Sequence, residues 1–521
     1  MMKDKVLTYF KENKFLIRKL TVFLIIFSIL LFSVYIITGY TCPDGLCEGL
    51  TYDENADWHL QCGRWFVRYL NLLIGNNVVI PLFVVLGYAF CVVCISLVLK
   101  ELLSFESNVP VYVMGAVLLA SPSVISQITF PYIFISYGAA FLFAILYAFF
   151  VWNKKWVMCI PATICITLMM GLYQAYVSAA AMIILILIIK DVLSGRKIGL
   201  ILKDAIKAVI VAAMGSLVDI LIYTCELKVR GLSESVRVAD STVSKMFEFF
   251  FDSVKGTYIY FFDYYFSDAR MGRSIIFSIL FLLLALGFCW CAAKIIKSEK
   301  SKGIGKVILL IFAVFLLPIA ANLILIFVPD NNVTLPMQSH YALVFCLLFV
   351  FYRFIDFKVK LFNCIIAGVL GILTYTFFIA SNATQLAMKE SYQTIYAQTA
   401  LILEDVYDLE GYIPNETPIV FVGYPSEEYV QNRLPVYEQA IGLNDNQAFW
   451  KGENGEIVCR HKYIMNYFGI NAGFFTADEF YEATESPEFL DMPIWPAKGS
   501  VAFIGDKVVV KLTDDDYPRR G

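Results

Sequence analysis

The residues best suited to carry chemistry lie in one short stretch, Thr51–Phe66, with the sequence TYDENADWHLQCGRWF. Three of its side chains are carboxylates, Asp53, Glu54 and Asp57, and His59 and Arg64 are basic. A carboxylate can take a proton from an attacking hydroxyl, and a guanidinium can hold an anionic leaving group. A carboxylate pair can also hold a divalent cation through oxygen ligands, but no clear third ligand accompanies this pair. The stretch therefore predicts acid–base chemistry beside a bound anion, and no defined metal site.

The rest of the chain is strongly apolar. Of its 521 residues, 59% are hydrophobic, 16% are aromatic and only 16% are charged, whereas a soluble protein carries about 25% charged residues. We therefore expect an α-helical polytopic membrane protein. The ionisable stretch then needs water or mutual pairing between its apolar neighbours. No basic stripe indicates nucleic-acid binding.

Eleven segments are candidates for crossing the membrane, which takes about 20 apolar residues. They are Leu20–Tyr40, Val78–Leu99, Val109–Ser123, Tyr132–Trp152, Val157–Gly171, Ala175–Ile189, Ala208–Cys225, Ser274–Ile296, Val307–Val328, Tyr341–Tyr352 and Leu361–Ala380. The first lacks a small-residue cleavage site after it, so we interpret it as an uncleaved anchor. The two that flank residues 171–174 are short for a full crossing.

Lysine and arginine predict the orientation of these segments. With a cytoplasmic N-terminus, the inner loops hold 22 such residues and the outer loops before residue 381 hold nine. This asymmetry satisfies the positive-inside rule. The acidic loop, 41–77, and the C-terminal tail are then outside. In that loop Cys42 and Cys47 flank a turn, and a disulfide between them is left open.

Two polar breaks are expected on the same side of the membrane. Residues 120–132 contain two prolines and Gln127, and residues 171–176 place Tyr173 and Gln174 inside an apolar run. Proline frees backbone groups that water or protein must satisfy. Both breaks suit the wall of an outward-opening cavity. A plain interfacial turn explains either one equally well.

Other candidate site residues each have a structural alternative. Asp219 lies inside an apolar segment, where an acid normally faces a cavity or a partner, so a structural hydrogen bond is the alternative. Arg270 and Arg273 follow an aromatic loop and could contact phosphate. His340 could face the same cavity, although a backbone partner at a helix end is the commoner role. Residues 58–74 have the spacing of one interfacial amphipathic helix.

The tail has a different composition. Residues 381–521 hold 22 acidic and ten basic residues and no spanning run. We expect a membrane domain over 1–380 and a small extracytoplasmic α/β domain over 381–521. The predicted elements are a helix at Ala383–Gly411, a strand at Pro418–Tyr424 and a hairpin at Gly499–Leu512 that turns at Gly505-Asp506. We interpret this domain as an acceptor-binding or stabilising module.

Three classes of function remain at this point. A transporter would gather polar groups near the midplane, between repeated halves. Here the polar groups gather at one face and no internal repeat is evident, which favours an enzyme. A lipid-linked sugar flippase and a structural scaffold remain the alternatives.

The order of several short motifs is similar to that of the bacterial type II Gtr glucosyltransferases, which modify O-antigen. The motifs are Tyr52-Asp53-Glu54, Gly63-Arg64-Trp65, Ser121-Pro122-Ser123, the 171–176 segment GLYQAY, and a tail segment from MPIWP at 492–496 to VVVK at 508–511. The resemblance implies a GT-C-type fold in the bacterial cell membrane. It also implies an inverting transfer of a sugar, glucose in this family, from an undecaprenyl-phosphate donor to a glycan acceptor.

The resemblance also implies residue roles. A polyprenyl phosphate is already a good leaving group, so one base suffices, unlike in a glycosidase. Asp53 is the first candidate for that base, Glu54 the second, and Asp57 an orienting group or metal contact. The Asp-Glu pair stands where two aspartates are expected, which leaves open which acid acts. Arg64 would offset charge on the departing phosphate.

Overall fold

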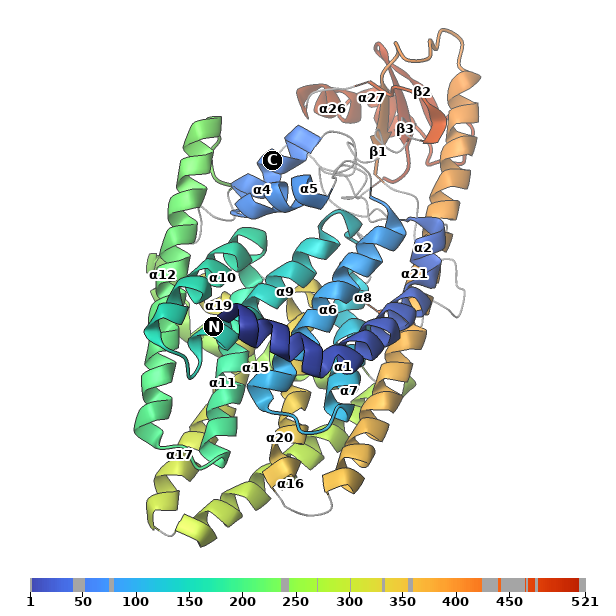
Figure 1. The fold of residues 1–521 in the computed structure, drawn as a ribbon. Helices are drawn as coiled ribbons and strands as arrows, with labels where there is room; N and C mark the ends of the chain where they lie inside the picture. Colours follow the sequence, from blue (N-terminus) through green and yellow to red (C-terminus); the bar gives the residue numbers. More distant parts are fainter. Residues whose placement is uncertain are drawn as a thin grey trace. The chain divides into compact units, whose positions relative to one another are not determined.

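The chain folds into two compact units. The computed structural model describes residues 2–40, 52–74, 79–235, 243–268, 270–299, 301–329, 333–354, 359–423, 439–441, 464, 467–473 and 477–514. The first unit comprises Met1–Ile36 and Tyr52–Asn382, and the second comprises Ile37–Thr51 and Ala383–Gly521. Figure 1 follows both units along the chain.

The first unit consists of helices. Its first half contains α1 (Met2–Leu31), α2 (Ser33–Thr38), α4 (Tyr52–Gln61), α5 (Trp65–Ile74), α6 (Pro81–Leu103), α7 (Val109–Ala120), α8 (Pro122–Gln127), α9 (Pro131–Val151), η1 (Trp156–Met158), α10 (Cys159–Leu172), η2 (Gln174–Tyr176), α11 (Val177–Leu193) and α12 (Ile198–Arg230). Its second half contains α14 (Val243–Glu248), α15 (Phe250–Phe266), η3 (Arg270–Gly272), α16 (Arg273–Glu299), α17 (Ser301–Phe315), α18 (Leu317–Ala321), α19 (Ile324–Phe327), η4 (Leu335–Phe345) and α20 (Cys346–Phe354). Helix α21 (Val359–Tyr407) continues into the second unit.

Long apolar helices confirm the expected class of polytopic helical membrane protein. In the described part of the chain, eight helical segments are long and apolar enough to span a membrane: Pro81–Leu103, Pro131–Val151, Gln174–Leu193, Ile198–Arg230, Arg273–Glu299, Gly303–Ala321, Leu335–Phe354 and Leu361–Tyr407. Each corresponds to an expected span.

Eight of the eleven expected spans meet this criterion among the described residues. Val109–Ala120 and Trp156–Leu172 are among the shorter apolar helices. Twelve residues of α7 rise about 18 Å, less than the hydrocarbon thickness of about 30 Å. The expected first span is divided, because α1 ends at Leu31 and α2 begins at Ser33. Hydropathy reports composition and does not detect these helix ends.

Helix α9 lies at the centre of the first unit. It packs against α6, α10 and α11, while α10 also packs against α12 (Figure 1). Tyr88 of α6 stacks on Phe134 of α9 with ring centroids 4.3 Å apart, and both rings are buried. Since lipid is as apolar as these side chains, close packing and interhelical hydrogen bonds stabilise such contacts. The centre of the unit therefore offers a rigid support for the segments at its ends.

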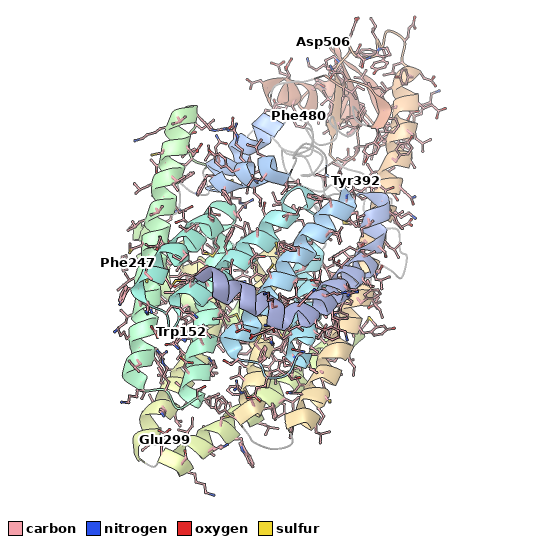
Figure 2. The ribbon with its side chains drawn as sticks, viewed as in Figure 1. Trp152, Phe247, Glu299, Tyr392, Phe480 and Asp506 are labelled. Carbon is pink, nitrogen blue, oxygen red and sulfur yellow. The ribbon has the colours of Figure 1, made fainter. Side chains whose placement is uncertain are left out.

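A cluster of four charged residues, Asp191, Arg196, Asp204 and Lys207, joins α11 to α12. Arg196 lies 2.8 Å from Asp191 and 2.6 Å from Asp204, and Lys207 lies 2.7 Å from Asp204. The indole of Trp152, labelled in Figure 2, donates to Asp191. This charge cluster lies at the C-terminal end of α11 and the N-terminal end of α12. The opposite ends of the same helices adjoin η2, α4 and α5.

The second unit contains a three-stranded sheet. Its elements are β1 (Ile419–Val422), α26 (Ala477–Thr484), α27 (Pro487–Asp491), β2 (Val501–Ile504) and β3 (Lys507–Lys511). The strand order is β1-β3-β2, with β1 parallel and β2 antiparallel to β3. The predicted strand and hairpin are confirmed, and the turn falls at Gly505-Asp506.

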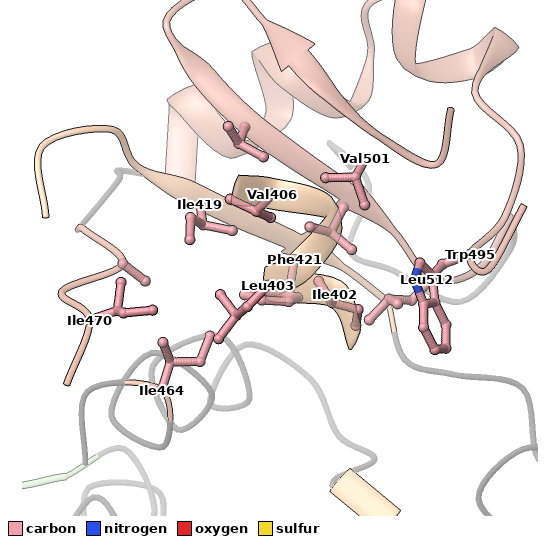
Figure 3. Packing of buried hydrophobic residues seen from close by; sticks show 13 residues of the cluster. Ile402, Leu403, Val406, Ile419, Phe421, Ile464, Ile470, Trp495, Val501 and Leu512 are labelled. Atoms are coloured by element: carbon pink, nitrogen blue, oxygen red, sulfur yellow. The ribbon is translucent and has the colours of Figure 1, made fainter. Parts of the chain in front are cut away.

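Alternation along β3 gives this sheet two apolar faces. Val508 and Val510 pack with Ile402, Leu403 and Val406 of α21 in one buried cluster (Figure 3). Val509 packs on the other face with residues of α26 and α27, in a cluster that includes Phe480 and Phe489. Successive strand residues point to opposite faces, so β3 serves both clusters. The predicted helix at Ala383–Gly411 is the second half of α21 and ends at Tyr407.

Candidate functional site

The acidic stretch forms two helices, so the prediction of one helix over residues 58–74 is wrong. Helix α4 ends at Gln61 and α5 begins at Trp65. Gly63 has a φ of +79°, Gly63 N donates to Leu60 O and Arg64 N donates to His59 O, each at 2.8 Å. This is the glycine-terminated helix end known as a Schellman motif. Gly63 was the sequence signal for this break.

The turn between α4 and α5, Cys62–Arg64, is held by a neighbouring helix break. Gln174 of η2 donates from Nε2 to the carbonyl of Cys62 at 3.1 Å. The φ of +79° at Gly63 favours glycine, and a Cβ there would lie 2.5 Å from Gln174 Nε2 and displace this amide. Gln174 and the acidic stretch, which are predicted to share a site, are therefore in direct contact.

A second contact fixes the start of α5. Trp65 Nε1 donates to Asp219 Oδ1 of α12 at 2.7 Å, and both side chains are buried. A Cβ at Gly171 would lie 2.5 Å from the Trp65 indole. Asp219 therefore has the structural hydrogen bond that was its alternative interpretation. The sequence places its partner Trp65 in a family motif and in the amphipathic segment 58–74, but predicts no hydrogen-bond partner for it.

The C-terminal end of α12 makes further contacts with α4 and α5. Tyr223 donates to the carbonyl of Gln61 at 3.2 Å. Arg230 forms an ion pair with Asp57 of α4, and Tyr69 of α5 donates to Glu226. Sequence reasoning missed Tyr223, Glu226 and Arg230, although their spacing along one helix is a signal for a shared face.

Arg64 points toward an aromatic group. Its guanidinium carbon lies 4.9 Å from the ring centroid of Tyr173, and Tyr137 meets Tyr173 edge to face with centroids 4.9 Å apart. Arg64 Nε is buried and has no hydrogen-bond partner among the described residues. An unsatisfied buried donor costs about 1–3 kcal/mol, and more when it is charged. An anion is one acceptor that would satisfy it.

Gln127 lies in a separate buried network of four side chains: Tyr88, Gln127, Tyr176 and Ser339. The hydroxyl of Tyr88 donates to Gln127 Oε1 at 3.2 Å. Gln127 Nε2 donates to the Tyr176 hydroxyl at 3.0 Å and to the carbonyl of Pro336 at 2.6 Å. Tyr176 and Ser339 hydroxyls are 2.8 Å apart. Because protein groups occupy this amide, the contacts support a packing role for Gln127.

His340 belongs to the same region of the unit. Its Nε2 lies 2.8 Å from the carbonyl of Ala321, and its ring meets Tyr176 with centroids 6.3 Å apart. A backbone partner was the alternative interpretation of this histidine. Tyr173 and Tyr176 have ring centroids 5.9 Å apart. The segment 173–176 therefore connects the Arg64–Tyr173 contact to the network around Gln127.

Several predicted site residues lie outside what the structure describes. Asp53 and Glu54 are in the first turn of α4, but their side chains are not described, nor is that of Arg270. Cys42 and Cys47 are in an undescribed segment. Arg273 is buried, and its Nη2 lies 2.8 Å from Asp268. Among the described side chains, no group of three or more His, Cys, Asp or Glu residues could hold a metal ion.

Comparison with curated proteins and with solved structures gives no match. A family model described as Glucosyl transferase GtrII matches residues 48–352. The match includes every candidate site residue, from Asp53 to His340. Because it covers more than half of the chain, this membrane protein belongs to the GtrII glucosyl transferase family.

Proposed function

We propose that this glycosyltransferase moves glucose from a polyprenyl phosphate, such as undecaprenyl phosphate, to a glycan of the bacterial cell envelope such as O-antigen. The observation that carries the proposal is the Arg64 guanidinium, which lies over Tyr173 with its Nε buried and without an acceptor among the described side chains. The turn that carries Arg64, Cys62–Arg64, follows directly after α4, the helix that carries Asp53 and Glu54. An anion site beside an acidic helix is what transfer from a lipid phosphate needs.

The proposed reaction is a single displacement of the inverting type. A carboxylate of α4, Asp53 or Glu54, takes the proton from an acceptor hydroxyl. The hydroxyl oxygen attacks the anomeric carbon of the donor and forms the new glycosidic bond. The bond from that carbon to the phosphate oxygen breaks, and its electron pair leaves with the polyprenyl phosphate. No metal is needed to balance this step.

Arg64 would stabilise the departing phosphate. Negative charge grows on the bridging oxygen as its bond to carbon breaks, so a fixed cation there favours the transition state over the ground state. Arg64 is held for this task by the turn at Gly63 and by the Tyr173 ring. A guanidinium that lies over an aromatic ring can still bind oxygen through its N–H donors.

The test compares envelope glycans from cells that express wild type, Asp53→Asn or Glu54→Gln. Glu106→Gln is the matched control, because Glu106 is an exposed partner of Arg353 far along the sequence from α4. We expect one or both variants at α4 to lose glucosylation by at least about 100-fold, the usual scale for removal of a general base. All variants must reach the membrane in equal amounts.

Full glucosylation by both α4 variants would overturn the role of the acidic pair. Movement of lipid-linked glucose across vesicles without a new glycosidic bond would instead identify a flippase. Glucosylation that persists in cells unable to make polyprenyl-phosphate glucose would exclude the proposed donor.

A further inference from the structure

Five residues form a stripe on the C-terminal part of α12: Asp219, Tyr223, Glu226, Leu227 and Arg230. Their spacing follows the helical repeat, so they share one face of the helix. Each of them contacts α4, α5 or the turn between them. Asp219 accepts a hydrogen bond from Trp65, and Tyr223 donates one to the carbonyl of Gln61. Arg230 forms an ion pair with Asp57. Glu226 binds Tyr69, and Leu227 packs with Leu60 and Trp65.

We propose that this α12 stripe is a positioning device for the acidic helix α4. Asp219 and Asp57 then act through the partners they hold and do not touch the substrate. The inference rests on the proposed function, because it takes α4 as the carrier of the base. It assigns to two predicted site acids a different role from substrate binding or proton transfer.

The Asp57–Arg230 pair fixes the rotation of α4. Asp57 lies four residues after Asp53 and three after Glu54, so all three positions share one face of the α4 backbone. An ion pair from that face to α12 determines which way the face is turned. Arg230 also lies 3.8 Å from Glu226, which limits how far the guanidinium can follow a displaced α4.

The Trp65–Asp219 bond fixes the other side of the turn. The indole is held between Asp219 and the backbone at Gly171, where no room for a Cβ exists. Displacement of Trp65 would move the turn and, with it, both Arg64 and α4. Misplacement of a reacting group by about 1 Å can lower a rate by about 100-fold.

A charge swap distinguishes positioning from chemistry at Asp57. The single variants Asp57→Arg and Arg230→Asp are each expected to lower glucosylation by about 100-fold. The double variant reverses the pair, so we expect it to recover most of the loss. A double variant as inactive as Asp57→Arg would show that Asp57 itself acts on the substrate, and would overturn the proposal for this residue.

At Asp219, the conservative variant Asp219→Asn distinguishes a positioning role from a direct role on the substrate. Asp219→Asn keeps a carbonyl oxygen that can accept from Trp65 Nε1, whereas Asp219→Ala removes the acceptor. We expect Asp219→Asn to retain activity and Asp219→Ala to lose it. Trp65→Phe should lower activity as much as Asp219→Ala does, and combining these two changes should lower activity little further. If Asp219→Asn is inactive while the α4–α5 turn is cleaved by trypsin at the wild-type rate, the charge of Asp219 acts on the substrate and the positioning role is wrong.

Trypsin provides a readout that does not depend on activity. Cleavage after Arg64 or Arg68, measured by mass spectrometry on the full chain in vesicles, reports release of the α4–α5 turn. We expect faster cleavage in Asp219→Ala and Asp57→Arg, and wild-type rates in Asp219→Asn, the charge-swapped double variant and the control Cys225→Ala. Cys225 is exposed on the opposite face of α12.

The two proposals fail in different ways. If wild-type cells transfer no glucose, the proposed function is wrong, and the cleavage rates still decide whether the α12 stripe holds α4. If transfer occurs but cleavage is unchanged in Asp219→Ala and Asp57→Arg, the positioning role is wrong.

Discussion

At the scale of single residues, Arg64 combines an aromatic contact with a buried hydrogen-bond donor, and exposure to water would satisfy that donor. Its charge is stabilised by the Tyr173 ring, yet its Nε is buried without an acceptor in the part of the chain that the structure describes. A planar guanidinium can stack on a ring and bind an oxyanion through its edge at the same time, whereas an ammonium has no plane to stack. The choice of arginine at this position therefore matters beyond its charge.

Replacement of Arg64 tests this point. We expect Arg64→Lys to lower glucosylation by about tenfold and Arg64→Ala by about 100-fold, since a charged hydrogen bond contributes about 1.5–3 kcal/mol. Glucose incorporated into the envelope glycan is the measurement. Arg353→Lys is the control, because Arg353 binds the carbonyl of Ser104 and Glu106. Equal activity of Arg64→Lys and wild type would show that a point charge is enough.

At the scale of elements, the charge cluster joins the C-terminal end of α11 to the N-terminal end of α12, away from the end of α12 that contacts α4. Asp204 accepts from both Arg196 and Lys207, and all three have little exposure. Removal of one partner from a buried ion pair leaves the other charge without compensation. The cluster therefore ties α12 to α11, and α12 in turn carries the stripe that holds α4.

Loss of Asp204 should unfold this end of the unit. Asp204→Ala is expected to destabilise the protein by about 3–5 kcal/mol, the usual effect of breaking a buried pair. The midpoint of thermal unfolding in detergent measures it. Glu106→Gln removes an exposed pair and should cost at most about 1 kcal/mol. Equal midpoints for the two variants would show that Asp204 is not part of a stabilising network.

Local signals predicted some elements and not others. The 171–176 break was predicted because Tyr173 and Gln174 interrupt an apolar run, and the β2–β3 hairpin because Gly505-Asp506 separates two apolar strands. The break at Gly63 was not predicted, since aromatic spacing over residues 58–74 suggested one helix. Asp219 was identified as unusual, but its partner Trp65 is 154 positions away. Such pairings depend on how α5 and α12 pack, which no local pattern reports.

At the scale of the whole molecule, each unit has its own core. The helical unit is built on α9, while the second unit packs both faces of a small sheet. Composition indicated this division because charged residues become frequent after residue 380. The division alone does not determine on which side of the membrane each terminus lies.

The lysine and arginine distribution makes that orientation testable. With 22 such residues in the proposed inner loops and nine in the outer loops, we expect a cytoplasmic N-terminus and an external C-terminal unit. A green fluorescent protein joined at the N-terminus should fluoresce, and alkaline phosphatase joined after Gly521 should be active. The reverse pair of signals would contradict both the orientation and a periplasmic site.

The length of α12 has a consequence for where in the membrane the reaction occurs. Its 33 residues rise about 50 Å, against a hydrocarbon layer of about 30 Å. Helices α4 and α5 attach between Asp219 and Arg230, a rise of about 16 Å at one end of this helix. The point of attachment along α12 therefore determines the depth of α4 relative to the membrane. With the orientation proposed above, we expect α12 to hold the acidic helix near the level of the lipid headgroups. The phosphate of the proposed lipid donor lies at that level, so the donor would reach the site without leaving the membrane.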